Sequence, residues 1–417
     1  MKNERLIISG IFLLSIALAL LGLYFKHFEY KSKPLTPYSN SFDIFSFFGT
    51  REKPKYTIYG YLPYWSLNQV KYLQMDKLTD IAYFGLYINP DGTFKKTVET
   101  DEGLITDPGY NKWKTSEDLD AAIAAAKKYG VRFALTIIAH TDDENDEFLD
   151  CRSCWDKLLQ NTENELDSKG IKDVNLNFEY AGQTDPARAQ EFAEFTRFFN
   201  DSLDQKYGDS RVIVAAFADS NIENRVSSKI DLLAKYSDGI FIMAYDFHRP
   251  QSDYAGPVSP IEGKGTHGNY DITTMLKDYL AVAPPNKLIL GVPYYGYNWV
   301  VEDDSEYAKR LEGNDDIGHS ESETYAVIMD MISELKPEVK WDSVGHVPYF
   351  SYISPDTDST REVYYENERS LREKYFLVRT NKFLGAGIWA LGYDEGYTDL
   401  WNVLYDEFIA GSTNTSN

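Results

Sequence analysis

The sequence predicts an α/β protein whose main domain is a closed (β/α)8 TIM barrel. From Thr57 onward, short apolar runs alternate with longer amphipathic runs, which is typical of parallel strands covered by helices. Eight such apolar runs occur in order, and eight strands are the number that closes this barrel. With 43% apolar residues and 15% aromatic residues, the 417-residue chain can fill a core of this size.

The predicted strands are the eight apolar runs at residues 57–61, 80–88, 132–140, 173–179, 211–218, 239–245, 287–296 and 385–392. Helical stretches lie between them. In the stretch at 116–130, Ser116 suits the N-cap and Gly130 the stop, and a second stretch covers 185–203. The interval from Trp299 to Leu384 is too long for a simple connection and contains both helical and strand-like runs. It therefore predicts a small α+β insertion, at residues 300–384, after strand seven.

The N-terminus carries the one membrane candidate in the sequence. Leu6 to Phe25 contains no charged residue, follows Lys2 and Arg5, and has the length that crosses a bilayer core. A cleaved signal peptide is the alternative, because Ala17 and Ala19 fit a small-residue cleavage site, although cleavage there would leave the apolar LLGLYF exposed. We expect an uncleaved transmembrane helix and a single-pass membrane protein, with the large C-terminal part outside the cytoplasm.

The chain is therefore divided into an N-terminal anchor at residues 1–30, a linker at 31–54, the barrel domain at 55–410 and a tail at 411–417. The linker is rich in Pro, Ser and Lys. A formal charge of −23, with 65 acidic against 42 basic residues, argues against a nucleic-acid partner, since little would neutralise the phosphates.

The only two cysteines are Cys151 and Cys154, in the sequence CRSC. Two thiols cannot complete a four-ligand zinc site, and no histidine lies close to them in sequence. A local disulfide and two ordinary thiols remain open, whereas a redox-active pair lacks the expected strand-turn-helix context. The acidic segment at residues 141–147 lacks an ordered ligand spacing for calcium, so we expect a solvated loop there.

The fourth predicted strand carries an unusual set of polar residues in DVNLNFE. Side chains alternate along a strand, so Asn175, Asn177 and Glu179 share one face. Burying a polar group without a partner costs roughly 1–3 kcal/mol, so a core strand rarely collects three of them. Their presence indicates a functional face.

Other chemically distinctive residues also fall at strand ends. Strand six ends in Tyr245, Asp246 and His248, while Tyr295 and Tyr297 follow strand seven and Trp389 lies in strand eight. A strand-end acid often caps the next helix, and a tyrosine or tryptophan in a strand is often core. Because the C-terminal ends of barrel strands meet at one rim, their joint occurrence predicts an active site there.

These residues resemble the glycoside hydrolases of family 18, the chitinase-like barrels. The resemblance covers residues 57–408 and rests on five motifs in order. They are GYLPYW (60–65), KDVNLNFE (172–179), which looks like the family signature DxxDxDxE, MAYD (243–246), GVPYYGYNW (291–299) and GAGIWALG (385–392).

The resemblance implies hydrolysis of a β-linked N-acetylglucosamine glycan, either chitin-like or peptidoglycan, by a retaining, substrate-assisted mechanism. The substrate's acetamido oxygen would attack the anomeric carbon, and Glu179 would be the general acid. Tyr245 would bind the acetamido oxygen, with Asp246 beside it and Trp389 beneath the sugar. Further substrate-binding positions are Tyr61, Asn175, Met243, Tyr295 and Tyr297. No metal or cofactor is required, and we expect a monomer.

The sequence departs from the family signature at every Asp, which is replaced by Lys172, Asn175 or Asn177. Asn177 stands where an Asp would orient the acetamido group and balance its developing charge. The amide oxygen can still accept the acetamido N–H, but it carries no charge, and a lost electrostatic element costs on the order of 10²–10³ in rate. The alternative is therefore an impaired, carbohydrate-binding protein, while the retained Glu179 favours an enzyme. A barrel with unrelated chemistry is the remaining alternative.

Overall fold

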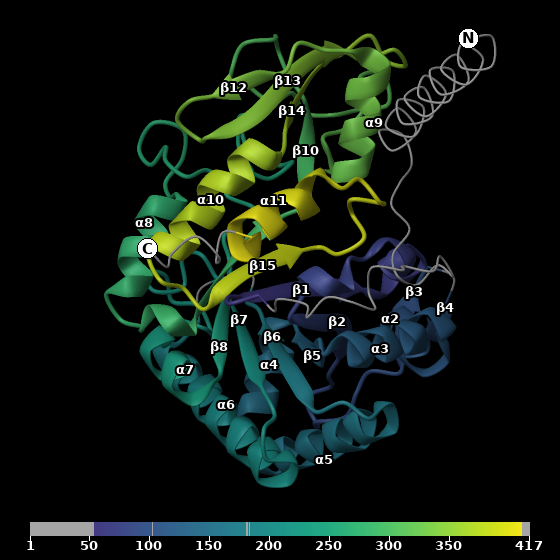
Figure 1. Ribbon diagram of the computed structural model, residues 1–417, viewed down its shortest axis with the longest axis vertical. Helices are drawn as coiled ribbons and strands as arrows, with labels where there is room; N and C mark the ends of the chain where they lie inside the picture. Colours follow the sequence, from purple (N-terminus) through teal and green to yellow (C-terminus); the bar gives the residue numbers. More distant parts are fainter. Residues whose placement is uncertain (1–53, 102, 181, 183, 411–417) are drawn as a thin grey trace, which may run out of the picture.

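The computed structural model describes residues 54–101, 103–180, 182 and 184–410. Its centre is a closed barrel of eight parallel strands in the order β1-β15-β9-β8-β7-β6-β5-β2, which confirms the predicted barrel (Figure 1). The barrel strands are β1 (Thr57–Pro63), β2 (Asp80–Tyr87), β5 (Arg132–Ala139), β6 (Asp173–Phe178), β7 (Val212–Phe217), β8 (Gly239–Met243), β9 (Leu288–Pro293) and β15 (Gly385–Trp389).

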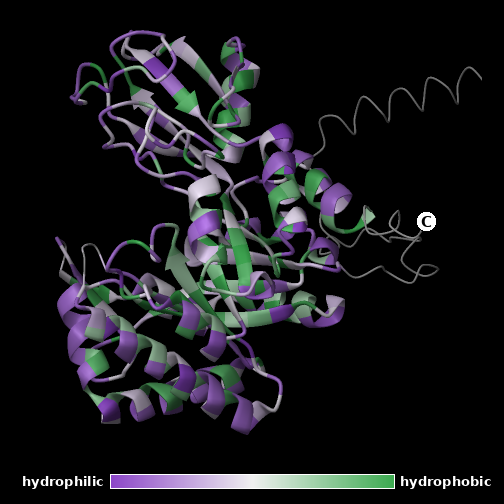
Figure 2. Cartoon of the chain, turned by 90° about the vertical axis from the view of Figure 1, so that its left-hand side faces the viewer, coloured by the Kyte–Doolittle hydropathy of each residue, from purple (hydrophilic) through white to green (hydrophobic). Residues whose placement is uncertain are grey.

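Amphipathic helices surround the barrel, with apolar faces on the strands and hydrophilic faces outward (Figure 2). Ser116 Oγ accepts the Leu119 N–H, and Gly130 ends the helix in the left-handed region at φ 70°, so the predicted caps of α3 are confirmed. The described α-helices other than α9 are α2 (Pro108–Thr115), α3 (Glu117–Tyr129), α4 (Asp142–Asp150), α5 (Arg152–Lys169), α6 (Pro186–Tyr207), α7 (Ile230–Tyr236), α8 (Ile272–Leu280), α10 (Glu368–Thr380) and α11 (Asp399–Phe408). Short 3₁₀ segments are η2 (Tyr64–Tyr72), η3 (Met75–Lys77) and η4 (Pro285–Lys287), and a hairpin joins β3 (Thr97–Thr100) to β4 (Gly103–Thr106).

Aromatic side chains fill the barrel interior. The ring of Tyr61 lies 4.7 Å from that of Phe241 and 5.5 Å from that of Tyr59, and all three side chains are buried. Gly387 makes room for them, because a Cβ there would lie 2.0 Å from the Phe241 ring. This aromatic layer supports the open end of the barrel, where the strands finish.

Between β9 and β15 the chain builds a second, antiparallel sheet in the order β11-β10-β14-β13-β12, with α9 beside it (Figure 1). The run predicted as one strand at 287–296 is divided, because β9 ends at Pro293 and β10 begins at Tyr295 in the second sheet. Apolar residues continue across this bend, so periodicity did not mark it. The elements are β10 (Tyr295–Val300), β11 (Glu321–Thr324), α9 (Tyr325–Leu335), β12 (Lys340–Asp342), β13 (Val347–Ile353) and β14 (Thr360–Tyr364).

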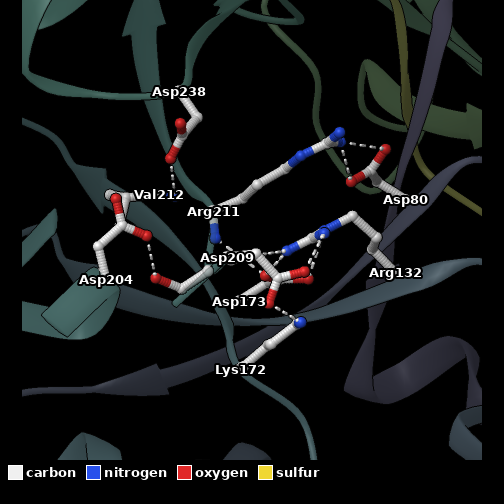
Figure 3. Close-up of polar contacts among 10 residues, drawn as sticks. Asp80, Arg132, Lys172, Asp173, Asp204, Asp209, Arg211, Val212 and Asp238 are labelled. Atoms are coloured by element: carbon white, nitrogen blue, oxygen red, sulfur yellow. Dashed lines mark hydrogen bonds and ion pairs between the residues drawn. The ribbon is translucent and has the colours of Figure 1, made fainter. Parts of the chain in front are cut away.

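Ion pairs cross the N-terminal ends of the barrel strands (Figure 3). Arg132 Nε donates to Asp173 Oδ2 at 2.9 Å, and the Arg211 backbone N–H donates to Asp173 Oδ1 at 2.9 Å. The Arg211 guanidinium lies 3.1 Å from Asp80. Both carboxylate side chains are only 6% exposed, so this end of the barrel is closed by paired charges.

Two sequence predictions need correction. The acidic segment at 141–147, expected as a loop, lies almost wholly in α4, where Asp142, Asp143 and Glu144 occupy the first turn and complement the helix dipole.

The predicted single-pass membrane localisation is wrong for the described part of the chain, in which no helix is long and apolar enough to cross a bilayer. The longest helix there, α6, buries Phe192 and Phe195 but exposes Glu194 and Arg197, because it packs one face on the barrel. The predicted anchor at 1–30, the linker up to residue 53 and the tail at 411–417 lie outside the described residues.

Candidate active site

A cavity of about 350 Å³ opens at the C-terminal end of the barrel strands. Eight residues named from the sequence line it, contributed by five of the eight barrel strands or the segments that follow them. They are Tyr61, Asn177, Glu179, Met243, Tyr245, Asp246, Tyr295 and Trp389. The size and the mixed apolar and polar lining suit a small organic group such as one sugar ring.

Glu179 directly follows β6 and its backbone is held on both sides. Its N–H donates to the Ala139 carbonyl at 2.8 Å, while its carbonyl accepts from Asn145 Nδ2 at 3.1 Å. The same Asn145 amide also donates to the Ala139 carbonyl. The buried Asn145 of α4 therefore ties together the ends of β5 and β6, which fixes the direction of the Glu179 side chain.

His140 lies beside both Glu179 and Asn177. Its Nε2 is 3.3 Å from Glu179 Oε1 and forms a short contact with Asn177 Oδ1. Because an amide oxygen only accepts, Nε2 carries the proton of that contact. The oxygen expected to receive the substrate's acetamido N–H is therefore already engaged by His140.

The charges around Glu179 set its protonation. Burial raises the pKa of Glu179, but the hydrogen bond and charge of His140, together with Asn177 and Arg249, lower it by more. The pKa of Glu179 therefore lies below its usual value. For His140, burial lowers the pKa, and the hydrogen bond and charge of Glu179 bring it above its usual value. The two groups therefore compete for protons as one pair.

Asp246 is held by two tyrosines. Its Oδ1 accepts from the Tyr297 hydroxyl at 2.6 Å and from the Tyr295 hydroxyl. Its backbone adopts φ 61°, in the left-handed region that Asp tolerates better than most residues. Burial, followed by the charge of Asp246, raises the pKa of both tyrosines, so they stay protonated and donate. Tyr297 thus supports Asp246 from outside the cavity lining.

Aromatic rings form the remaining wall. Trp389 meets Phe84 edge-on at 4.8 Å and Tyr61 at 5.4 Å, so its indole is fixed from two sides. Trp65, in η2, lies 6.4 Å from Trp389 and is 46% exposed, with its Nε1 donating to the Tyr393 hydroxyl at 3.1 Å. Together they offer an apolar surface that continues out of the cavity.

Asn175 lies below the cavity and does not line it. Its Oδ1 accepts from the Tyr61 hydroxyl at 3.1 Å, and its Nδ2 donates to the Ile213 carbonyl at 3.1 Å. It is fully buried, with both ends of the amide satisfied. Asn175 therefore positions Tyr61.

A second hollow of about 550 Å³ adjoins the cavity and shares Phe217, Met243, Tyr245, Asp246 and Arg249 with it. Its outer wall comes from the loop between β8 and α8, which contains Tyr254, His267 and Tyr270. A groove that continues beyond one sugar-sized cavity suits a polymer.

Several residues of the site were missed from the sequence. His140 ends the third predicted strand, so the strand-end criterion used for Glu179 would have found it. Phe84 and Phe217 lie in strands that were identified. Trp65 lies in η2 and Arg249 in the loop after β8, and strand periodicity does not predict the placement of either.

The two cysteines lie away from the cavity lining. Cys151 and Cys154 form a disulfide at the start of α5, which selects the first of the two alternatives left open by the sequence.

Comparison with known proteins agrees with this geometry. The profile of the glycosyl hydrolases family 18 matches residues 57–394. A putative sporulation-specific glycosylase of Bacillus subtilis, YdhD, is 25% identical over 249 residues, which are 57% of this chain and 52% of that protein. The chain thus spans about half the length of this curated relative.

Solved structures share the fold. The spore cortex-lytic enzyme SleL of Bacillus megaterium superposes with a TM-score of 0.66 at 19% identity, over 86% of this chain and 75% of that one. A Cycas revoluta chitinase in complex with (GlcNAc)3 superposes with a TM-score of 0.68 at 17% identity, over 84% and 99%. Because the family profile covers most of the chain and the barrel carries the predicted motifs at its rim, the chain belongs to glycosyl hydrolase family 18.

Proposed function

We propose that the protein hydrolyses β-linked N-acetylglucosamine glycans. The observation that carries the proposal is the Glu179 carboxyl, at the wall of a sugar-sized cavity that also contains Tyr245, Asp246 and Trp389. Relatives named as a cortex-lytic enzyme and as a chitinase bound to (GlcNAc)3 support the substrate class. The chain would therefore cut either peptidoglycan or a chitin-like polymer.

The mechanism we propose is substrate-assisted. The acetamido oxygen of the bound sugar attacks its own anomeric carbon while Glu179 protonates the leaving glycosidic oxygen, and the carbon–oxygen bond breaks. The Glu179 carboxylate then takes a proton from water, whose oxygen opens the oxazolinium ring at the same carbon. Two displacements at one carbon give retention of configuration, and Glu179 ends protonated as it began.

Each neighbour has a role in this scheme. Burial, then Tyr61 and Asp246, raise the pKa of Tyr245, so its hydroxyl remains a donor for the acetamido oxygen. The Trp389 indole would lie under the distorted sugar. Asn177 can orient the acetamido group through the remaining lone pair of its oxygen, because His140 occupies the other.

A carbohydrate-binding protein without turnover is the second candidate. It is favoured by the neutral Asn177, whose oxygen already has a partner, so that nothing at this position balances the charge of the oxazolinium.

Incubation of the full chain with chitin oligomers and with peptidoglycan, alongside Glu179→Gln, separates the candidates. The enzyme proposal expects new reducing ends from at least one substrate and their loss in the variant. Binding without products from either substrate would support the second candidate.

A further inference from the structure

Among the residues that the structure describes, His140 is the one whose side chain forms an ion pair with the Glu179 carboxyl. Its Nε2 lies 3.3 Å from Glu179 Oε1, and its ring packs 5.7 Å from that of Tyr87 and 6.3 Å from that of Phe84. The ring is thus held with one nitrogen toward the carboxyl. A proton on that nitrogen or on that oxygen would lie in the same short gap.

The amide of Asn177 adds no charge to the His140–Glu179 pair. His140 and Glu179 together with one dissociable proton are neutral overall, whether the form is imidazolium with carboxylate or imidazole with carboxylic acid. A carboxylate at 177 would give the imidazolium a second anionic partner and favour it strongly. In the imidazolium form, Asn177 Oδ1 accepts the Nε2 proton without adding that charge. When this proton passes to Glu179, the imidazole keeps its proton on Nδ1 and Asn177 loses this donor, so that both forms remain accessible.

We infer that His140 and Glu179 share one proton, and that His140 is a positioning residue which keeps this proton available to Glu179 at a pH where an isolated carboxyl would have lost it. This inference deepens the proposed function and rests on it. The imidazole holds the proton in the free protein and returns it to the carboxyl when the sugar enters. His140 itself need not touch the substrate.

Displacement of water by the bound sugar favours movement of the proton from His140 to Glu179. In the free protein the side chains of His140 and Glu179 are 30% and 27% exposed, so water stabilises the charge-separated form. A sugar that fills the cavity removes that water, and separated charges become costlier in the lower dielectric. The neutral pair, with the proton on Glu179, then becomes the favoured form for catalysis.

The surrounding groups permit this transfer. Arg249, after β8, favours the Glu179 carboxylate, but it is exposed at the mouth of the cavity. Asp246 is already bound by Tyr295 and Tyr297. Three tyrosines face the pair from β1, β2 and the end of β8, and burial raises the pKa of each, so they stay neutral; they are Tyr61, Tyr87 and Tyr245.

The pH profile of kcat/KM on a chitin oligomer tests the inference. With the pair intact, activity falls when the shared proton is lost, at a pH above the ordinary histidine pKa of about 6.5. In His140→Gln, the side-chain amide can still donate a hydrogen bond but does not titrate. The midpoint of the basic limb should therefore move to lower pH by about one to two units, toward the pKa of a carboxyl group. KM and the maximal rate at acidic pH should change less than tenfold.

Tyr87→Phe is the matched control, because it keeps the ring beside His140 but removes the hydroxyl, and its limb should not move. An unchanged basic limb in His140→Gln overturns the inference. A fall in activity at every pH, with the limb in place, also overturns it, since that result indicates a merely structural role.

Titration of the His140 ring signal in the free protein tests proton sharing without any turnover. The His140 ring signal, assigned by its loss in His140→Gln, should titrate about one pH unit lower in Glu179→Gln than in the natural chain. An identical midpoint in both proteins overturns proton sharing. Failure of hydrolysis with a lowered midpoint overturns only the proposed function.

Discussion

Replacing Arg132 by Met should destabilise the barrel strongly while leaving the active site in place. Arg132 donates twice to Asp173, whose side chain is only 6% exposed, and the Arg211 backbone N–H supplies the third donor (Figure 3). Removal of the guanidinium leaves one donor on a buried carboxylate. Breaking such a pair costs about 3–5 kcal/mol in unfolding free energy.

The cost should depend on pH in a defined direction. Burial raises the pKa of Asp173, and Arg132 opposes that rise, so the pKa should rise further in the variant. A carboxyl with a raised folded pKa binds a proton in the native state that the unfolded chain does not bind. Stability of the variant should therefore fall as the pH rises above the unfolded value of about 3.9, and the deficit should be smaller at pH 5 than at pH 7.

Urea unfolding followed by tryptophan fluorescence measures this difference, with Lys172→Met as the matched control from the same end of the barrel. Lys172 pairs with Asp209, but these side chains are 36% and 67% exposed, so the loss of Lys172 should change stability far less than the loss of Arg132. Glu179 lies about 20 Å along the strand from Asp173, so kcat should be unchanged below the unfolding temperature. Equal stability of the two variants at pH 7 would refute the reasoning.

Two further predictions concern the site. Asn177→Asp should raise kcat by on the order of 10²-fold, because a carboxylate at this position balances the oxazolinium charge. It should also move the basic limb of the kcat/KM profile to higher pH, because the added negative charge raises the pKa of the neighbouring Glu179. A basic limb that stays in place contradicts this account of the pH dependence. Trp65→Ala should raise KM for long oligomers by about tenfold, through the loss of roughly 1–1.5 kcal/mol of ring contact with the substrate. It should have little effect on KM for dimers or on the melting temperature, since the side chain is 46% exposed. Equal effects on short and long substrates would place Trp65 outside the binding groove.

Much of the barrel could be predicted because strands and helices have different periods. Each of the eight apolar runs contains a barrel strand, and the caps Ser116 and Gly130 are where side-chain chemistry places them. The rim could also be anticipated, since parallel strands bring their C-terminal ends together. From the sequence alone, this rule predicts that Glu179, Asp246 and Trp389 lie near one another.

What could not be predicted depends on tertiary packing. The bend between Pro293 and Tyr295 lies inside a continuous apolar run, so only the second sheet distinguishes β9 from β10. The acidic stretch at 141–147 was expected to be a solvated loop. Its acids instead lie in the first turn of α4, where the helix dipole favours them, and Asn145 connects the strand ends. His140 and Glu179 follow paired strands, so the strand-end rule could have brought the two residues together, but the placement of the His140 ring beside the Glu179 carboxyl depends on side-chain packing.

The stereochemistry of the first product tests the proposed mechanism most directly. Proton NMR of a chitin oligomer, recorded in the first minutes after addition of enzyme, distinguishes the two anomers before they interconvert. Substrate-assisted hydrolysis with Glu179 as the acid predicts the β-anomer first, because configuration is retained. The α-anomer would contradict the account, since it would require a second carboxylate such as Asp246 to activate water on the opposite face of the sugar.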